Sequence, residues 1–351
     1  MKAKISPGQM FILLILARIM HTMVFHSDDF SVGTYMLPTL LVTTLIEAAL
    51  SLPALILIDG GSDIISELSH GSKRAYMLLR LLYSLYFLYI ATGTIKYIAE
   101  FMHTQFRRVI SPIAVIVILA VAAAYCAHLG IEALARAGTV VFWIFIALFI
   151  SMALVSEGTF NTSNLTPITG NDFPAMLDYA VRDLSSGWWL PMLVVLGTHL
   201  NGSKDGAKKA AAGYLLFKLV MLEVLAVLII LVLGKFSDIL GYPLLALGAY
   251  ARTVFVQSFD AVNMFVWCMN AVLVCGVYLF ISSEGIKGKK GEFASLAITL
   301  AAGIIAYNLD LDFNGEVALI IKTAGIILLG VVPPLALMIE REVKKCVSSL
   351  Q

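Results

Sequence analysis

The feature that most constrains this chain is a recurring stretch of about twenty apolar residues. A helix needs about 20 such residues to cross the roughly 30 Å hydrocarbon core of a bilayer, because no water is present there to bond exposed backbone groups. Ten stretches reach or approach this length, with ends defined to about two to four residues. They cover residues 7–26, 34–58, 76–100, 111–129, 136–156, 174–200 (interrupted), 211–234, 247–283 (overlong), 292–308 and 317–339. We therefore expect an all-α, polytopic membrane protein with about ten transmembrane helices.

The composition agrees with a lipid environment. Of the 351 residues, 60% are hydrophobic and 13% are charged, whereas soluble domains are about 45–50% apolar and about 25% charged. A chain this apolar is neither a water-soluble globule nor a disordered polymer. Its net charge of +1 gives no general attraction for nucleic acid. The first apolar stretch is followed by acidic residues at 26–29 and not by a small-residue cleavage site, so we expect it to remain as a membrane span.

Basic residues are distributed unequally between alternate loops, which predicts the orientation. Fourteen fall on one side: Lys2, Lys4, Lys73, Arg74, Arg136, Lys204, Lys208, Lys209, Lys287, Lys289, Lys290, Arg341, Lys344 and Lys345. Five fall on the other: Arg107, Arg108, Arg182, Lys235 and Arg252. The richer side is expected to be cytoplasmic. Both termini lie on that side, which requires an even number of spans.

The sixth apolar stretch carries an interruption. The segment from Pro174 to Asp183 has the length of a half-helix, and residues 184–187 (Leu-Ser-Ser-Gly) then form helices poorly. The apolar run that follows, from Trp188 to Leu200, would rise only about 20 Å, which is too short to cross a bilayer alone. A helix broken around Leu184 to Gly187 fits this pattern, and such breaks are tolerated where the freed backbone lines an enclosed cavity. The alternative is an interfacial loop followed by a short tilted span.

No enzyme motif is present in the sequence. It contains no HExxH, GxSxG or Walker loop and no clustered acid–base pair. Its four cysteines form neither a CxxC pair nor a Cys/His cluster at metal-ligand spacing. We therefore expect neither catalysis nor a metal or other cofactor.

Four short segments follow one another in a defined order. They are Ile5-Ser6-Pro7-Gly8-Gln9, the stretch from Tyr125 to Gly138 that contains Gly130, Glu132 and Arg136, Asn164-Leu165-Thr166-Pro167, and Tyr242-Pro243 with the residues up to Arg252. Together with the length and the number of spans, they resemble the B-subunit family of spore germinant receptors. These proteins, also called endospore germination permeases, belong to the amino acid-polyamine-organocation superfamily.

The resemblance implies a fold and a function. The implied fold is a single permease-like domain of two inverted five-helix repeats, about 7–156 and 174–339, as in LeuT-like amino acid permeases. Its first and sixth helices are broken, and a midplane pocket lies between them and the third and eighth helices. The implied function is a germinant-sensing subunit in the spore inner membrane that binds a small metabolite, such as an amino acid. Its implied partners are an A-type membrane subunit and a C-type lipoprotein subunit.

The chain departs from the family pattern at both implied breaks. In the first span the chain reads Arg18-Ile19-Met20-His21-Thr22 where the family carries a glycine, and the sixth reads Gly187-Trp188-Trp189 where the family carries a carboxylate after the glycine. The expected ligand-binding residues lie around these two places and on the third span: Met20, His21, Thr22, Tyr86, Ser185, Ser186, Gly187, Trp188 and Trp189. The two tryptophans either wall the pocket or anchor the helix at the membrane interface.

Ionisable residues inside spans are costly and usually face the bundle interior, so they are candidates for charge pairing or ion coupling. The candidates are Arg18, Glu47, Lys218 and Lys322. A buried guanidinium needs an anionic or carbonyl partner, and Glu47 is the nearest candidate for Arg18 in sequence. If the two pair, they are scaffold; otherwise Arg18 is available to a ligand carboxylate. Lys322 either extends outward to the interface or lines the bundle. Lys96 and Glu100, four residues apart, are expected to form an ion pair.

Three functions remain open at this stage. The first is germinant sensing. The second is secondary active transport of amino acids coupled to protons or sodium, which the fold alone does not distinguish from sensing. The third is a purely structural subunit, which a pocket filled by Met20, Trp188 and Trp189 would favour.

Overall fold

The computed structural model describes residues 4–24, 33–59, 63–69, 72–106, 109–165, 173–201, 205–240, 242–250, 260–285 and 289–349. Most of these residues are helical, and none of them forms a β-strand. The helices are α1 (Pro7–Val24), α2 (Met36–Asp59), α3 (Ile64–Leu68), α4 (Lys73–Gln105), α5 (Pro112–His128), α6 (Ile131–Val155), α7 (Phe173–Ser185), α8 (Trp189–Leu196), α9 (Gly206–Leu233), α10 (Pro243–Tyr250), α11 (Asp260–Gly285), α12 (Lys289–Asn308), α13 (Glu316–Gly325) and α14 (Val332–Ser349).

The described helices can be assigned to the ten spans that the sequence predicts. Seven of the described helices are long and apolar enough to cross a bilayer: those based on α2, α4, α6, α9, α11, α12 and the continuous α13–α14 rod. Two shorter apolar helices, α1 and α5, and the pair α7 and α8 complete the set. The chain is therefore a multi-pass membrane protein.

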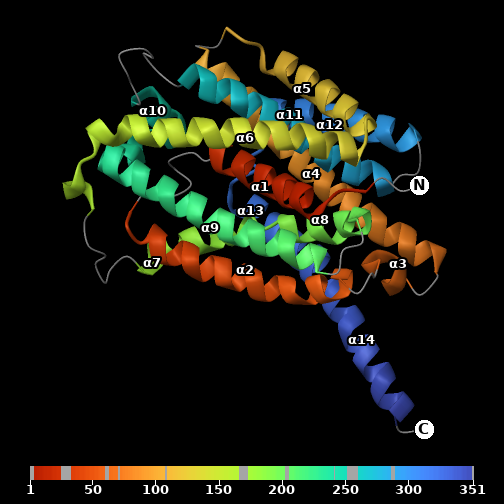
Figure 1. Cartoon of the computed structure of the whole chain (residues 1–351). Helices are drawn as coiled ribbons and strands as arrows, with labels where there is room; N and C mark the ends of the chain where they lie inside the picture. Colours follow the sequence, from red (N-terminus) through yellow and green to blue (C-terminus); the bar gives the residue numbers. More distant parts are fainter. Residues whose placement is uncertain are drawn as a thin grey trace.

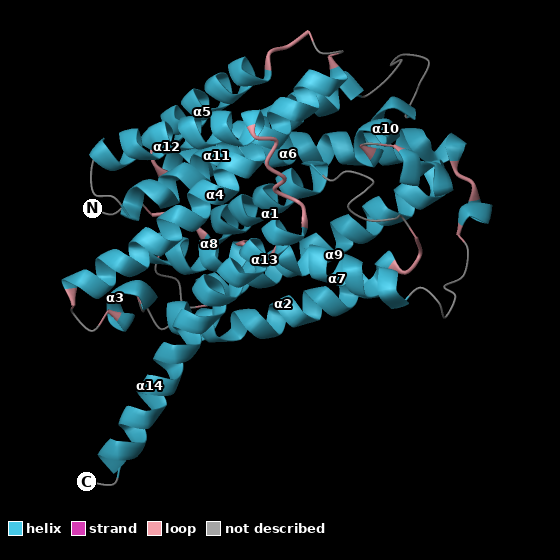
Figure 2. Cartoon of the chain, turned by 180° about the vertical axis from the view of Figure 1, so that it is seen from behind, coloured by secondary structure: helices cyan, strands magenta, loops and turns pink. Residues whose placement is uncertain are grey.

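The bundle is layered around α1 and α8. Figure 1 shows α5, α6 and α12 along one side and α2 and α9 along the other, with α1, α4 and α8 between them. Helix α11 packs against α4, α5, α6 and α12. The view from behind shows the same order, and α14 extends away from the bundle in both views (Figure 2). The start of the chain is tied to the end of the sixth span, because Ile5 N donates to His199 O at 2.8 Å and Asn201 N donates to Ile5 O at 2.9 Å.

The predicted interruption of the sixth span is confirmed. Helix α7 ends at Ser185 and α8 begins at Trp189. Tight turns link the two, with Ser186 N donating to Asp183 O at 3.1 Å and Gly187 N donating to Leu184 O at 3.0 Å. The freed backbone groups are therefore partly satisfied within the break, as burial in a membrane protein requires.

One expectation about the spans needs correction. Helix α1 is continuous over Pro7–Val24, so the described part of the first span carries no break. The residues there explain why: no glycine lies within Arg18–Thr22, and the Thr22 hydroxyl bonds back to Arg18 O at 3.1 Å. The described parts of the overlong stretch 247–283 belong to α10 and α11. Residues 25–26, Thr166-Pro167 and 251–259 of the predicted spans and motifs lie outside the described residues.

The tenth span contains a π-helical turn at Ile326–Val331 that packs against α8. Gly330 permits the close approach, because a Cβ there would lie 2.8 Å from Leu190 Cβ. The wider π-helical turn lets a backbone carbonyl accept a hydrogen bond from another helix. This carbonyl is Leu329 O, which accepts from the Tyr83 hydroxyl on α4 at 2.6 Å. The tenth span is thereby fixed to both α4 and the broken sixth span.

Close packing around α11 gives a prediction for Gly276. A Cβ at this position would lie 3.0 Å from Leu134 Cδ2, 3.1 Å from Cys126 Cβ and 3.3 Å from Ala123 O. We expect Gly276→Val to lower the free energy of unfolding by about 1–3 kcal/mol, because overpacking forces the neighbouring helices apart. The same substitution at Gly158, where nothing lies within 4 Å, is the control and should change it by less than about 0.5 kcal/mol. Thermal unfolding in detergent measures both, and equal effects would contradict the prediction.

Candidate functional site

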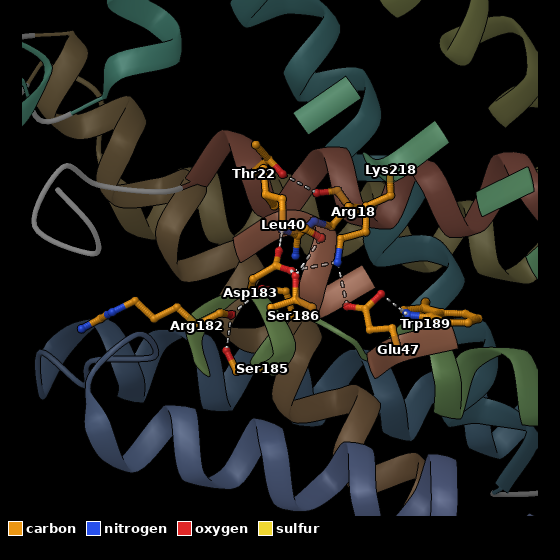
Figure 3. Close-up of polar contacts among 11 residues, drawn as sticks. Arg18, Thr22, Leu40, Glu47, Arg182, Asp183, Ser185, Ser186, Trp189 and Lys218 are labelled. Carbon is orange, nitrogen blue, oxygen red and sulfur yellow. Dashed lines mark hydrogen bonds and ion pairs between the residues drawn. The ribbon is translucent and has the colours of Figure 1, made fainter. Parts of the chain in front are cut away.

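Four charged side chains form a continuous chain through the middle of the bundle. Arg18 on α1 pairs with Asp183 at the end of α7. Lys218 on α9 then bridges two carboxylates, with Nζ 2.9 Å from Asp183 Oδ2 and 2.8 Å from Glu47 Oε1 on α2. The chain ends at α8, where Trp189 Nε1 donates to Glu47 Oε2 at 3.1 Å. Figure 3 shows these residues in a row between the helices.

This network is almost completely buried. Arg18, Glu47, Asp183 and Lys218 are 3%, 2%, 1% and 0% exposed. Two positive and two negative charges cancel, and Thr43 adds a hydrogen bond to Asp183 Oδ2 at 2.6 Å. Charges are tolerated in an apolar interior only when they are paired and hydrogen-bonded. The network therefore holds five helices, α1, α2, α7, α8 and α9, in one arrangement around the break.

A pocket lies next to the break, with Trp188 in its wall. We call it the central pocket, and it encloses about 400 Å³ between its walls, part of it open to solvent. Its walls come from α1, α4, α11, α13, the break itself and the loop before α13. The lining residues are Met20, His21, Tyr89, Ile90, Gly93, Thr94, Tyr97, Trp188, Tyr278, Phe313, Asn314 and Lys322.

The central pocket combines aromatic walls with one ammonium group. The His21 and Trp188 rings meet edge to face, with centroids 4.6 Å apart. Lys322 is only 6% exposed, so it does not extend outward. Its Nζ donates to Asn314 Oδ1 at 2.9 Å and lies 5.9 Å from the centre of the Trp188 ring. Such a site can receive a small molecule that carries both an anionic group and an apolar part.

The predicted ligand-binding residues divide between the pocket and the network. Met20, His21 and Trp188 line the central pocket. Trp189 faces the other way, bonding Glu47 and lying with its ring centroid 4.6 Å from that of Tyr214.

The remaining predicted residues do not line the central pocket. The hydroxyls of Ser185 and Ser186 donate to Arg182 O and close the end of α7. A Cβ on Gly187 would lie 3.7 Å from Glu47 Oε1, so this residue faces the charge network. The Tyr86 hydroxyl donates to Lys322 O at 3.2 Å and joins α4 to α13. Thr22 lines a different pocket, beside Arg18.

The candidate pairing of Arg18 with Glu47 does not form. Arg18 pairs with Asp183, and Glu47 pairs with Lys218. Sequence reasoning missed Asp183 because it stands at the end of an amphipathic half-helix, where a carboxylate normally reaches water. The position of Asp183 directly before the predicted break could have indicated that it is buried, because the end of a half-helix in such a span lies at membrane depth.

The motif residues have structural surroundings. Gly130 precedes α6 with φ of +85°, a conformation that favours glycine. Glu132 Oε1 accepts from Lys4 N at 3.0 Å, and Arg136 Nη2 lies 3.8 Å from Glu132 Oε2. Pro243 is the first residue of α10.

Two further expectations concern polar groups. The predicted pair of Lys96 and Glu100 is confirmed at 2.6 Å. No group of three or more His, Cys, Asp or Glu residues that could hold a metal ion occurs in the described part of the chain.

Comparisons with known proteins match this chain to one family and to one transporter fold. Residues 4–308 match the model of a family described as spore germination protein. The chain is 26% identical over 261 residues to spore germination protein KB from Bacillus subtilis (strain 168), and the alignment covers 70% of this chain and 67% of that protein. The fold of this chain is similar to that of a substrate-bound, outward-open Na⁺-coupled sialic acid symporter, with a TM-score of 0.60 and 12% identity. That match covers 94% of this chain and 79% of the symporter. At that identity the likeness concerns the fold alone.

The charge network predicts the effect of removing Lys218. We expect Lys218→Met to lower the free energy of unfolding by about 3–5 kcal/mol, because it leaves Glu47 as a buried charge without a cation. Adding Glu47→Gln should restore part of the loss, since the remaining Arg18 and Asp183 cancel. Thermal unfolding in detergent measures both variants.

The control is Lys208→Met, which removes a half-exposed lysine near Asp59 and should lower the free energy of unfolding far less, because solvent screens that pair. The network would not be the main constraint on these helices if Lys218→Met and Lys208→Met had equal effects.

Proposed function

Because this chain belongs to the spore germination protein family, we propose that it is the ligand-sensing membrane subunit of a spore germinant receptor. In this proposal a small metabolite binds in the central pocket, and the conformation of the broken sixth span carries the signal. The observation that supports it is the position of the pocket, whose wall includes Trp188 within the break. A ligand there contacts the part of the span that is least restrained by helical hydrogen bonds.

The chemistry of the pocket favours a small amphipathic acid, such as an amino acid. Lys322 supplies a positive charge for a carboxylate. The rings of Tyr89, Trp188 and Phe313 supply apolar and π-rich walls for an aliphatic part or an ammonium group. His21 lies at the junction of α1 and the break, where it is placed to distinguish ligands by hydrogen bonding.

Signalling requires that the ligand prefer one of two arrangements of the bundle, since equal affinity for both would shift nothing. The charge network links the break to α1, α2 and α9, so movement of Trp188 also affects Trp189 and its bond to Glu47. We propose that this change reaches an A-type membrane subunit and a C-type lipoprotein subunit. The receptor would stand in the spore inner membrane, with both termini of this chain in the cytoplasm and with two inverted repeats, about 7–156 and 174–339.

The alternative is ion-coupled transport, and the buried carboxylates argue against it. Among the described residues, the buried carboxylates are Glu47 and Asp183, and Lys218 is bonded to both. A site that couples transport to Na⁺ or a proton needs a carboxylate or carbonyl oxygen that can bind the ion in at least one conformation of the bundle. The network already neutralises both groups. A purely structural role is also less favoured, because Met20 and Trp188 line the central pocket without filling it and Trp189 faces away.

The pocket assignment predicts the effect of filling it from α4. Thr94 lines the central pocket and its hydroxyl bonds back to Ile90 O. In spores that carry Thr94→Leu, we expect the germinant concentration for half-maximal germination to rise by about tenfold or more, equivalent to about 1.4 kcal/mol of lost binding.

The matched control is Thr104→Leu, an exposed threonine on the same helix whose hydroxyl also bonds back four residues, to Glu100 O. Its spores should respond as the wild type does. If Thr94→Leu spores respond normally at equal protein amounts, the ligand does not occupy the central pocket.

The choice of sensing over transport predicts the outcome of an uptake measurement. In proteoliposomes with an imposed sodium or proton gradient, we expect labelled amino acids to accumulate no more than in liposomes without protein. The reason is that neither buried carboxylate is available to a coupling ion. Robust gradient-driven accumulation would identify a secondary transporter instead.

A further inference from the structure

A second pocket lies beside Arg18, between α1, α2, α7, α9 and α10. We call it the Arg18 pocket; it has about 480 Å³ between its walls and shares no lining residue with the central pocket. Arg18, Thr22 and Tyr179 give it polar atoms, while residues such as Leu225, Ala226 and Leu244 give it an apolar wall. The function proposed above makes no use of it.

The Arg18 side chain has unused donor capacity in this pocket. Its Nη2 atom pairs with Asp183, whereas Nε and Nη1 are buried and have no hydrogen-bond partner among the described residues. A guanidinium stays charged at any physiological pH, so it cannot relieve this by losing a proton. Because a buried donor without a partner is costly, an arginine left in this way indicates an acceptor that is bound at some point in the protein's work.

The acceptor is expected to be an anion. Arginine hydrogen-bonds carboxylates strongly because both charge and geometry match. The Asp183 carboxylate remains hydrogen-bonded when Arg18 also bonds a ligand, because Lys218 and Thr43 donate to it as well. A ligand ammonium has no equivalent partner here, because both oxygens of Asp183 are already bonded. A monoanion without an ammonium group therefore fits better than a free amino acid.

The surroundings indicate an aliphatic chain on that anion. A neighbouring cavity of about 380 Å³ shares Thr22, Leu225 and Leu244 with the Arg18 pocket. Its other walls include Phe145, Met152 and Met221 from α6 and α9. An acyl chain whose carboxylate lies at Arg18 has apolar surface to cover in this direction.

We propose that the Arg18 pocket is a second ligand site that binds a free monocarboxylate with a short aliphatic chain. The carboxylate accepts hydrogen bonds from Arg18, and the chain packs between Leu225 and Leu244. Occupation divides the hydrogen bonds of Arg18 between the ligand and Asp183, which places the site in contact with the network that holds the break. The two sites are then linked through the same buried charges.

The test is equilibrium binding of radiolabelled butyrate to the full chain in nanodiscs of zwitterionic lipid at constant ionic strength. We expect saturable binding at one site per chain. Unlabelled butyramide, which has the same shape without the charge, should not compete. Absence of saturable binding, or competition by butyramide equal to that by butyrate, would overturn the proposal.

Two variants fill the pocket without touching the charges. Ala226→Phe acts from a buried position on α9, and Leu244→Trp acts from a half-buried position on α10, so the second remains informative if the first fails to fold. Both should weaken butyrate binding at least tenfold while the protein stays monodisperse. Unchanged affinity in the folded variants would refute the site. Thr94→Leu fills the central pocket and leaves the Arg18 pocket open, so saturable butyrate binding at one site per chain should persist, whereas its loss would place butyrate in the central pocket and overturn the proposal.

One further measurement distinguishes a free carboxylate from a lipid phosphate. Adding phosphatidylglycerol to the nanodiscs should leave butyrate binding unchanged. Displacement of butyrate by this lipid in the wild type would assign the Arg18 pocket to a lipid headgroup and overturn the proposal.

Discussion

The cancellation of charges inside an apolar bundle is the constraint on which the rest of this structure depends. Arg18, Asp183, Lys218 and Glu47 are buried and bonded in sequence, so none of them can be removed alone without leaving a charge in a medium that does not solvate it. The network connects helices far apart in the chain. It fixes the break in the sixth span against α1, α2 and α9, and thereby sets where the adjacent pockets can form.

Two adjacent tryptophans at the break lie in different environments, one in the central pocket and one beside the charge network. Trp188 lines the central pocket next to His21, while Trp189 bonds Glu47 and packs against Tyr214. A contact made by a ligand on the first ring is one residue away from the charge network. This proximity joins the wall of the central pocket directly to the helices that the charge network holds.

The arrangement also shows a transporter-like fold whose buried carboxylates stand in internal ion pairs. The fold is shared with a sodium-coupled symporter at 12% identity, yet here both buried carboxylates in the described helices are occupied by a lysine of the same chain. While these ion pairs persist, neither carboxylate is available to an external cation. Function in such folds depends on these few sites and not on the architecture.

The sequence by itself determined the ten spans and the interruption at residues 184–187, because span length, apolarity and helix-breaking residues are local properties. It also placed Met20, His21 and Trp188 near one another, with the help of the family resemblance. Only the tertiary structure decided the charge pairing. Asp183 lies 165 residues from Arg18, and Lys218 lies 171 residues from Glu47, and no local periodicity relates such positions. Which buried acid meets which base depends on how the helices pack, and that is fixed by the whole bundle at once.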